Sequence, residues 1–453
     1  MKKATSLKIS ISGVRGIVGE SLTPQLASSF AQAFGTYIGR GAVVVGQDSR
    51  ISGTMVKKAV ISGLLAVGCQ PIEIGICPIP SIQIFTKETE ARGGIAVTAS
   101  HNPKEWNGMK FISGEGLFLN HHQVEEFLDI YHQGEFSRIG VNEYKSPKSE
   151  ENPTVPHLRK LLSYLNVELI RSKKFKVAAD CANGAGAVLV PEFLDALGCR
   201  KILINDVPDG SFAHHPEPLP ENITGLCRTV VEQGADVGFV QDADADRLAV
   251  VNEKGDPLGE EMTLILASKH VLSKNPGAVV VNLSASQAID DIAREFNVRV
   301  FRTKIGEINV VDQVLALEGK TAIAGEGNGG VILPDIHPCR DSFTAMGLIL
   351  ESMASSGKKV SELQEQVPKY HIIKDKIDGT QEEAFGIIRQ LKRNYSSQEI
   401  SLLDGLKIQF KDSWFHIRPS NTEPIIRLLA EARTKKQAEN LLSKFKKEIS
   451  EII

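Results

Sequence analysis

The feature that most constrains the fold is one pattern that occurs three times along the chain. It consists of an apolar, β-branched run, a loop of small residues, a segment of helical period and a second apolar run, and it begins at residues 41–53, 174–187 and 277–287. Such units build parallel sheets whose strands are buried on both faces. Gly68 and Gly198 stand where the end of a helix favours a left-handed residue. The pattern predicts three related α/β domains in tandem.

The C-terminal part of the chain follows a different pattern. Residues 402–420 alternate and turn like an antiparallel hairpin, and residues 434–453 form an amphipathic helical segment. The polar, proline-containing stretch at 144–156 and the "EKGDPLG" stretch at 253–259 favour domain boundaries. We predict α/β domains over residues 1–150, 151–253 and 254–367, and a smaller α+β domain over residues 368–453.

Composition excludes several classes of protein. A chain of 453 residues is too long for one core, and its net charge of -3 gives no sign of a nucleic-acid or acidic-membrane partner. The six cysteines are dispersed without a CxxC pair, which argues against a zinc site or a disulfide framework and favours a reducing compartment. The N-terminal residues lack the apolar core of a signal peptide, and no apolar run reaches membrane-spanning length. We therefore expect a cytoplasmic, multidomain protein.

A serine beside a histidine follows the apolar run at residues 94–97. The stretch "VTASHNPKEWNGMK" contains Ser100, His101 and, ten residues after the serine, Lys110. Serine is a weak nucleophile at neutral pH and needs help to carry a covalent group. Ser100 is thus either a helix cap or a reacting group. A helix that begins near Asn102 would help to hold an anion on Ser100.

Three aspartates alternate with alanines in "QDADADRLAVV". Asp242, Asp244 and Asp246 repel one another unless a cation joins them, and hard oxygen ligands suit Mg²⁺, Mn²⁺ or Ca²⁺. An EF-hand is the obvious competitor because Glu253 lies at the twelfth position. However, Arg247 occupies the sixth position, where that loop needs glycine, and the residues that follow it predict a strand. The pattern therefore favours a metal site at the end of a strand over an EF-hand, with a solvated acidic loop as the remaining alternative.

Two further loops could bind a ligand. "AGEGNGGV" brings the backbone close to a ligand through its glycines and offers Glu326 and Asn328 to read it; the alternative is a plain glycine-rich turn. "FHIRPSNTEPIIR" combines a guanidinium, hydroxyls and turn amides, which suit a phosphate. The candidate phosphate-binding residues there are Arg418, Ser420, Asn421, Thr422 and Arg427. Arg15, between glycines in "SGVRGIVG", is either a surface turn residue or a cation for an anionic ligand.

Together these residues predict phosphoryl transfer. A divalent ion held by Asp242, Asp244 and Asp246 could also bind an oxygen of a phosphorylated Ser100. Positive side chains would stabilise the transferring group while the Arg418 loop holds a second phosphate. The candidate catalytic residues are Ser100, His101, Arg15, Lys110 and Arg247.

The chain resembles the α-D-phosphohexomutases over essentially its whole length. The motifs "TASHNP", "DADADR", "GEGNGG" and "RPSNTEP" are similar to that family's phosphoserine, metal, sugar and phosphate loops and come in the same order. "SGVRG" and "GQDSR" resemble its N-terminal arginine loop and the neighbour of that loop. The resemblance implies three related α/β domains with mixed sheets plus a smaller C-terminal α+β domain around a central cleft.

The resemblance also implies a mechanism. A phosphorylated Ser100 would give its phosphoryl group to a hexose 1-phosphate or 6-phosphate. The 1,6-bisphosphosugar would turn over in the cleft, and Ser100 would take back the other phosphate. The family's cofactors would be one Mg²⁺ per chain, bound by Ser100 and the three aspartates, and a bisphosphosugar activator. The expected partner is a phosphosugar substrate, with no nucleic acid and no membrane, and the expected state is a monomer or homodimer.

The chain departs from the family pattern at several positions. Ala243 and Ala245 replace the commoner glycines of the metal loop, and Gly330 stands where many members place a histidine. Glu307 stands where some members have another histidine. The general acid/base therefore stays open among Lys110, His101, Arg15 and Glu307. His337 or Arg340 in "HPCRDS" would be additional residues of the cleft.

Several functions stay open. The sugar and following loops favour glucosamine phosphate as substrate, with a bifunctional phosphomannomutase/phosphoglucomutase as the alternative. A non-catalytic sugar-phosphate binding protein on the same scaffold, and a metal-dependent phosphatase, belong to other classes. Retention of Ser100, of the metal loop and of Arg247 argues against the binding protein.

Overall fold

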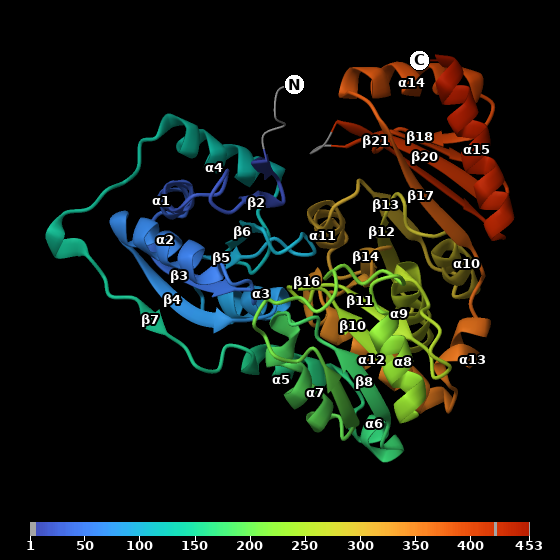
Figure 1. The fold of residues 1–453 in the computed structure, drawn as a ribbon, viewed down its shortest axis with the longest axis horizontal. Coiled ribbons are helices and arrows are strands. Elements are labelled where there is room, and N and C mark those ends of the chain that lie inside the picture. Colours follow the sequence, from blue (N-terminus) through green and yellow to red (C-terminus); the bar gives the residue numbers. More distant parts are fainter. Residues whose placement is uncertain (1–5, 421–423, 453) are drawn as a thin grey trace. The chain divides into compact units, whose positions relative to one another are not determined.

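The computed structural model describes residues 6–420 and 424–452. The chain divides into two compact units, whose helices and strands are labelled in Figure 1. The first unit consists of Met1–His270 and Asn328–Gln364, and the second consists of Val271–Gly327 and Glu365–Ile453. None of the described helices has the length and apolar character needed to cross a membrane.

The first unit begins with a seven-stranded sheet in the order β1-β2-β6-β5-β3-β4-β7. β3 is parallel to β4 and β5, whereas β6 is antiparallel to β5 and β2. The strands are β1 (Lys8–Ser10), β2 (Gly13–Ile17), β3 (Gly41–Gln47), β4 (Cys69–Ile76), β5 (Gly93–Val97), β6 (Trp106–Ser113) and β7 (Lys148–Ser149). β7 lies inside the stretch predicted as a linker and pairs with β4 at the sheet edge.

Helices cover both faces of this sheet. Val43 and Val45 of β3 belong to the core beneath α1 (Pro24–Tyr37), α2 (Gly53–Ala66) and α4 (His121–Gln133). Val44, between them, points to the other core beneath α3 (Ile79–Glu88). This alternation explains why the strand is apolar throughout.

The second sheet of the first unit has the order β11-β10-β8-β9. β8 is parallel to both β9 and β10, and β11 is antiparallel to β10. Its strands are β8 (Lys176–Asp180), β9 (Arg200–Ile204), β10 (Val237–Gln241) and β11 (Leu248–Val251), and its helices are α5 (Val155–Tyr164), α6 (Val167–Lys173), α7 (Val190–Ala196) and α8 (Thr224–Gln233). Short 3₁₀ turns lie at η1 (Val141–Glu143) and η2 (Ala185–Val188).

The rest of the first unit is a hairpin with helices. β15 (Gly330–Leu333) pairs antiparallel with β16 (His337–Arg340), and α12 (Ser342–Ser356) follows it. α9 (Glu260–Lys274) and α13 (Val360–Glu365) begin in this unit and end in the second.

The second unit holds two groups of strands. β12 (Ala278–Asn282) is parallel to β13 (Val300–Thr303) and β14 (Thr321–Glu326), and α10 (Ala288–Glu295) and α11 (Glu307–Ala316) connect them. The C-terminal sheet has the antiparallel order β17-β21-β20-β19-β18. Its strands are β17 (His371–Asp378), β18 (Glu399–Ser401), β19 (Leu406–Gln409), β20 (Ser413–Pro419) and β21 (Ile425–Ala432), and its helices are α14 (Gln381–Asn394) and α15 (Lys435–Ile452).

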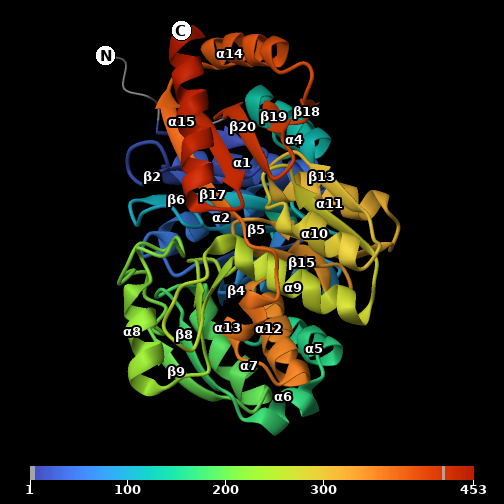
Figure 2. The same cartoon turned by 90° about the vertical axis from the view of Figure 1, so that its right-hand side faces the viewer.

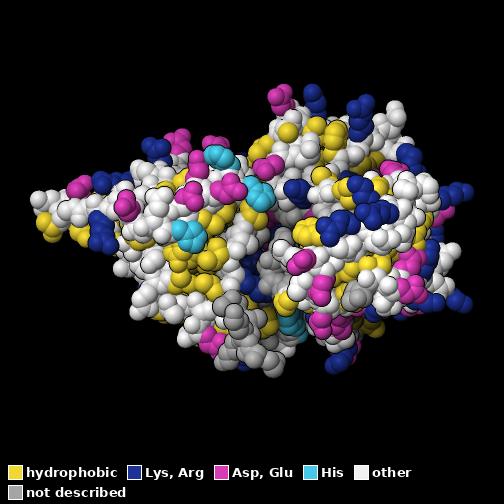
Figure 3. Space-filling view, turned by 90° about the horizontal axis from the view of Figure 1, so that it is seen from above, with side chains coloured by type: hydrophobic (Ala, Val, Ile, Leu, Met, Phe, Trp, Pro, Cys, Tyr) yellow, Lys and Arg dark blue, Asp and Glu magenta, His cyan; other side chains and the backbone are white. Residues whose placement is uncertain are grey.

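Both C-terminal helices pack on one face of the C-terminal sheet (Figure 2). Phe415 of β20 and Phe445 of α15 stack with ring centroids 3.8 Å apart. Acidic and basic side chains both occur over the face shown in Figure 3.

The structure confirms the predicted α/β organisation and the smaller C-terminal α+β domain. β3, β8 and β12, which open the three repeats, each have a parallel strand on both sides. Gly68 and Gly198 adopt φ angles of 81° and 68° after α2 and α7. The domain boundaries themselves stay a prediction.

Candidate active site

Ser100 lies in the loop between β5 and β6 and is buried. Its φ of 52° places it in the left-handed region, which is rare for a residue with a side chain. The Ser100 amide donates to Thr98 Oγ1 at 2.9 Å. Its Oγ lies 3.3 Å from Asp242 Oδ2 and 3.3 Å from His101 Nδ1. The structure thus brings the serine, the histidine and the aspartate loop together.

The predicted helix near Asn102 is wrong. Residues 100–105 form turns, and the next regular element is the strand β6. The reason is Arg50, whose guanidinium donates to the carbonyl oxygens of Ser100, Asn102, Pro103 and Trp106 at 2.5, 2.6, 2.6 and 3.0 Å. One guanidinium that binds four carbonyl oxygens of residues 100–106 draws them toward a single point, whereas the carbonyls of a helix point along its axis.

Arg50 is a site residue that the sequence pattern did not reveal. Its Nε donates to Asp48 Oδ2 at 3.0 Å, and the Thr98 hydroxyl donates to the same oxygen at 2.7 Å. All three side chains are buried. In the sequence, "GQDSR" was noted only as a motif. A signal for Arg50 was nevertheless available, because the motif lies at the carboxyl end of β3, and sites in α/β sheets are built at that edge.

The metal loop follows β10 and places three buried carboxylates side by side. Ligand oxygens of Asp242, Asp244 and Asp246 all lie within 4.8 Å of one another. In each carboxylate at least one oxygen is engaged by the protein. Asp242 Oδ1 accepts the amides of Asp246 and Arg247 at 3.1 and 3.2 Å, and Asp244 Oδ2 accepts Lys110 Nζ at 2.9 Å.

The remaining oxygens are left for a cation. Asp246 Oδ2 accepts Arg340 Nη2 at 2.6 Å, whereas Asp246 Oδ1 and Asp244 Oδ1 are buried and accept no hydrogen bond from the described residues. Asp242 Oδ2 accepts a long hydrogen bond from Ser100 Oγ at 3.3 Å. Three hard oxygens around one point suit Mg²⁺, so the residues present fit the predicted metal.

The electrostatics of this loop also fit a cation. Burial, together with the charges of Asp244 and Asp246, raises the pKa of Asp242 well above its usual range. Burial opposes ionisation of Asp244 too, but the Lys110 ammonium outweighs it and holds the pKa of that carboxyl below its usual range. A bound divalent ion would relieve the repulsion that raises the pKa of Asp242.

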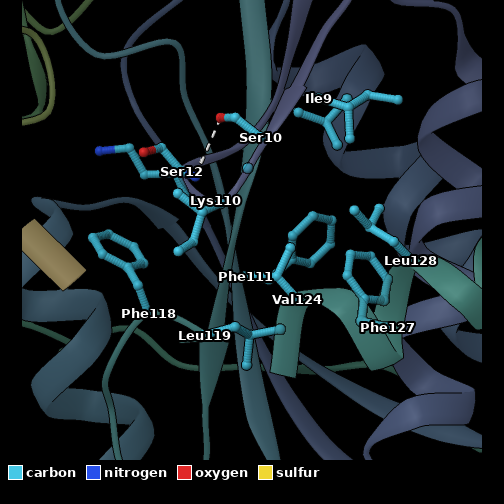
Figure 4. Close-up of a pocket in the computed structure, with 13 residues that line it drawn as sticks. Ile9, Ser10, Ser12, Lys110, Phe111, Phe118, Leu119, Val124, Phe127 and Leu128 are labelled. Atoms are coloured by element: carbon cyan, nitrogen blue, oxygen red, sulfur yellow. Dashed lines mark hydrogen bonds between the residues drawn. The ribbon is translucent and has the colours of Figure 1, made fainter. Parts of the chain in front are cut away.

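Lys110 reaches this loop from β6. Its stem borders a cavity of about 10 Å³ lined by Ser10, Ser12 and Phe118, among others (Figure 4). Its ammonium lies 5.3 Å from the Phe118 ring centroid and 3.5 Å from Asp246 Oδ2. The ammonium therefore faces two metal-loop carboxylates while its stem packs on apolar groups.

Further positive side chains surround Ser100. Arg15 Nη1 donates to Asn102 Oδ1 at 3.2 Å, and Arg247 Nε lies 3.8 Å from Asp246 Oδ1. Burial and the charges of Arg247 and Arg15 hold the pKa of His101 well below its usual range. His101 is therefore neutral near pH 7 and can accept a proton.

Two other candidates from the sequence, Arg340 and His337, have different partners in the structure. Arg340 contacts the metal loop, but His337 does not: its Nε2 hydrogen-bonds to the Gly116 carbonyl at 2.8 Å. Of the two alternatives, the structure therefore favours Arg340 as the residue that joins the metal loop. Glu307 lies buried at the start of α11 in the second unit.

The sugar loop spans the division between the units. In the second unit, Glu326 Oε1 accepts Asn282 Nδ2 at 2.9 Å and the Gly306 amide at 2.8 Å. In the first unit, Asn328 Oδ1 accepts the Gly330 amide at 3.2 Å. Both side chains are thus fixed by local hydrogen bonds.

The phosphate loop lies in the second unit at the end of β20. Arg418 pairs across the sheet with Arg427 on β21, so that two guanidinium side chains occupy neighbouring strands. Burial and the charge of Arg427 lower the pKa of Arg418, although Asp404 opposes this. The amide of Ser420 donates to the Ile425 carbonyl at 2.9 Å. Asn421 and Thr422 lie outside the described residues.

Comparison with known proteins covers nearly the whole chain. Residues 7–138, 155–255 and 259–370 match "Phosphoglucomutase/phosphomannomutase, alpha/beta/alpha" domains I, II and III, and residues 376–448 match the C-terminal domain of that family. "Phosphoglucomutase/phosphomannomutase" of Thermococcus kodakarensis is 39% identical over 95% of each chain. "Probable phosphoglucosamine mutase" of Methanopyrus kandleri is 35% identical over 96% of each.

A solved structure shows the same fold. The "putative phosphomannomutase" from Thermus Thermophilus superposes with a TM-score of 0.85 at 22% identity, over 99% of this chain and 100% of that one. Its four-domain architecture agrees with the predicted fold class. This chain therefore belongs to the phosphoglucomutase/phosphomannomutase family of phosphohexomutases and is an enzyme of that family.

Proposed function

We propose that the enzyme interconverts hexose 6-phosphate and hexose 1-phosphate through a phosphorylated Ser100 and a 1,6-bisphosphosugar. The observation that carries this proposal is the position of Ser100 Oγ, 3.3 Å from Asp242 Oδ2 in a loop that leaves three carboxylate oxygens for a cation. A phosphoryl group on that oxygen would lie between the cation site and the positive side chains Arg15, Lys110 and Arg247.

The residues of the first unit would perform the transfer. The bond from phosphorus to Ser100 Oγ breaks as the bond to the sugar hydroxyl oxygen forms, and the hydroxyl proton moves to a base. Ser100 Oγ takes up a proton as it leaves phosphorus, and of the candidates in this unit His101 is placed to exchange that proton, since its Nδ1 lies 3.3 Å from Ser100 Oγ. Mg²⁺ bound by Asp242, Asp244 and Asp246 would supply charge stabilisation to the transferring group.

The residues of the second unit would recognise the sugar. Arg418, Ser420 and Arg427 would bind the phosphate that does not react, together with Asn421 and Thr422. Glu326, with Asn328 of the first unit, would bind sugar hydroxyls. A bisphosphosugar activator would restore the phosphate on Ser100 whenever the intermediate escapes.

The proposed substrate is glucosamine phosphate. The Glu326 carboxylate could pair with a 2-ammonium group, and several relatives, including the one from Methanopyrus kandleri, are named phosphoglucosamine mutase. The relative from Thermococcus kodakarensis favours the alternative, a bifunctional phosphoglucomutase/phosphomannomutase.

The test compares kcat/KM for glucosamine 6-phosphate, mannose 1-phosphate and glucose 1-phosphate with Mg²⁺ and a trace of bisphosphosugar. A kcat/KM at least tenfold higher for glucosamine phosphate than for the other two sugars would support the proposed substrate. Comparable kcat/KM values for mannose 1-phosphate and glucose 1-phosphate, without such a preference, would instead support the bifunctional enzyme. Phosphopeptide mass spectrometry should find phosphate on Ser100. Release of inorganic phosphate in place of isomerised sugar would identify a phosphatase, and absence of both products would favour a binding protein.

A further inference from the structure

Residues 209–214, in the chain between β9 and α8, lie against the turn that carries Arg50. A Cβ on Gly210 would come within 2.3 Å of the Ser49 carbonyl oxygen, so only glycine fits at this contact. The Phe212 ring centroid lies 5.0 Å from the Arg50 guanidinium carbon. We call residues 209–214 the brace.

The brace has a strained backbone that its neighbours hold in place. Phe212 has a φ of 49°, a left-handed conformation that is uncommon for a bulky residue. The next amide, of Ala213, donates to Asn183 Oδ1 at 3.0 Å, and His214 Nε2 lies 3.0 Å from Asp180 Oδ2. Before Phe212, the Gly210 amide donates to the Asn183 carbonyl at 3.3 Å. Strain that is held by contacts before and after it indicates that the position of the Phe212 ring matters.

The loop that holds the brace also contacts the metal loop. Asn183 is followed by Gly184 and Ala185, and the Ala185 amide donates to the Ala243 carbonyl at 2.8 Å. A Cβ on Gly184 would lie 2.7 Å from the same carbonyl oxygen. A continuous set of contacts therefore runs from the metal loop through Asn183 and the brace to Arg50.

Arg50 in turn determines the shape of the phosphoserine loop. It is 2% exposed and engages four carbonyl oxygens of residues 100–106 besides the Asp48 carboxylate. Water that reached the guanidinium would compete for those carbonyls. The Phe212 ring packs on the guanidinium, keeps water away and attracts the cation through its π face.

We propose that the brace is a positioning element, in which Phe212 holds Arg50 and thereby fixes Ser100 relative to the metal-loop carboxylates. The inference rests on the proposed function only in taking Ser100 as the group that carries the phosphate. Phe212 does not touch the reacting atoms; it acts through Arg50.

Hydrogen exchange of the full-length enzyme tests this without reference to activity. Within residues 98–106, the Asn102 amide donates to the Ala99 carbonyl and the Trp106 amide to the Pro103 carbonyl, so both should be protected. We expect Phe212→Leu to speed their exchange about fivefold to tenfold, as the loss of one cation–π contact allows. Phe212→Tyr keeps the ring and should restore protection, and Phe385→Leu on the exposed face of α14 serves as the matched control.

Kinetics provide the second readout. Phe212→Leu should lower kcat about threefold to tenfold with KM changed less than about twofold, because Ser100 is displaced while sugar binding is untouched. If Phe212→Leu does not fold, Arg50→Lys, which cannot reach four carbonyls with one nitrogen, should give the same loosening of residues 98–106. Exchange in Phe212→Leu, or in Arg50→Lys, equal to that of the control would overturn the proposal. A wild-type enzyme that takes no phosphate on Ser100 would instead overturn the proposed function and leave the exchange result standing.

Discussion

The backbone of Ser100 carries a conformational cost that its neighbours offset. A left-handed residue with a side chain costs roughly 1–2 kcal/mol. Two hydrogen bonds hold Ser100 in this conformation: Arg50 donates to the Ser100 carbonyl, and the Ser100 amide donates to the Thr98 hydroxyl. The result is a hydroxyl that leaves the loop toward Asp242 and not along a strand.

Replacing this serine should abolish turnover with little effect on the fold. Ser100→Ala is expected to lower kcat roughly 10⁴-fold or more, as removal of a nucleophile does elsewhere. Steady-state kinetics measure the turnover, circular dichroism measures the fold and phosphopeptide mass spectrometry measures the phosphate, with Ser12→Ala as the control. Turnover by Ser100→Ala within tenfold of wild type would show that another residue carries the phosphate.

His337 gives stability a dependence on pH. Burial lowers its pKa to about 4, whereas an unfolded histidine titrates near its ordinary value. The unfolded state therefore binds the proton first, so the contribution is present above about pH 6.5 and is lost as pH falls toward 4. It amounts to about 3 kcal/mol. His337→Gln should make the fall of the unfolding free energy between pH 6.5 and 4 less steep in urea titrations, without removing it, because burial also lowers the pKa of His416 to about 4. The exposed His122→Gln should leave the slope as it was.

Candidate site residues with a recognisable chemistry could be predicted from the sequence. Residues that act by holding other parts of the site in place could not. The three aspartates and Ser100 were found because alternating carboxylates and an exposed-looking serine after a strand are rare without a function. Arg50 was missed because its acceptors are backbone carbonyls, which leave no pattern in the sequence. The sequence could not decide between His337 and Arg340, because the direction of a side chain depends on its neighbours in space.

Three helices of the first unit meet at a buried hydrogen-bonded chain. Ser81 of α3 lies 2.8 Å from His157 Nδ1 on α5, and His157 Nε2 lies 3.0 Å from Asp341 Oδ2. Asp341 caps α12 by accepting the Phe343 amide at 2.9 Å. Burial works against ionisation of Asp341, but the His157 ring outweighs it and holds its pKa below the usual range. This series of hydrogen bonds ends at Asp341, which follows Arg340 in the sequence, and Arg340 contacts the metal loop.

Breaking this chain should destabilise the fold. His157→Leu leaves the Asp341 carboxylate buried without its partner and is expected to lower the free energy of unfolding by about 3–5 kcal/mol. Ser81→Ala removes one neutral hydrogen bond and should cost about 1 kcal/mol. Chemical denaturation measures both, with His122→Leu as a surface control. A cost for His157→Leu below that for Ser81→Ala would mean that Asp341 is satisfied without the histidine.

Elements were easier to predict than their connections. β3 was recognisable because a strand buried on both faces is apolar throughout, and the closing helix α15 because its apolar stripe has helical period. β7 was not predicted, since two exposed residues at a sheet edge carry no periodicity. The irregular path of residues 100–105 was also not predictable, because a distant arginine imposes it.

On the scale of the whole molecule, the groups proposed to transfer phosphate and those proposed to bind the second phosphate belong to different compact units. Changes in the second unit should then alter substrate binding without altering the phosphorylated serine. Arg418→Ala is expected to raise KM about tenfold to a hundredfold, because the substrate phosphate would lose one or two charge-assisted hydrogen bonds. Its phosphoserine content, measured by intact-mass spectrometry, should equal that of wild type. Loss of phosphate from Ser100 in this variant would show that the two functions are not separable.

The division of the sugar loop has a consequence for how new specificities could arise. Under the proposed function, the serine that stores the phosphate and the metal-loop carboxylates all belong to the first unit. The two residues proposed to bind the sugar are divided, because Glu326 belongs to the second unit and Asn328, two residues later, belongs to the first. Substitutions within the second unit would then change how the non-reacting phosphate is bound, whereas a new sugar specificity would require substitutions in both units.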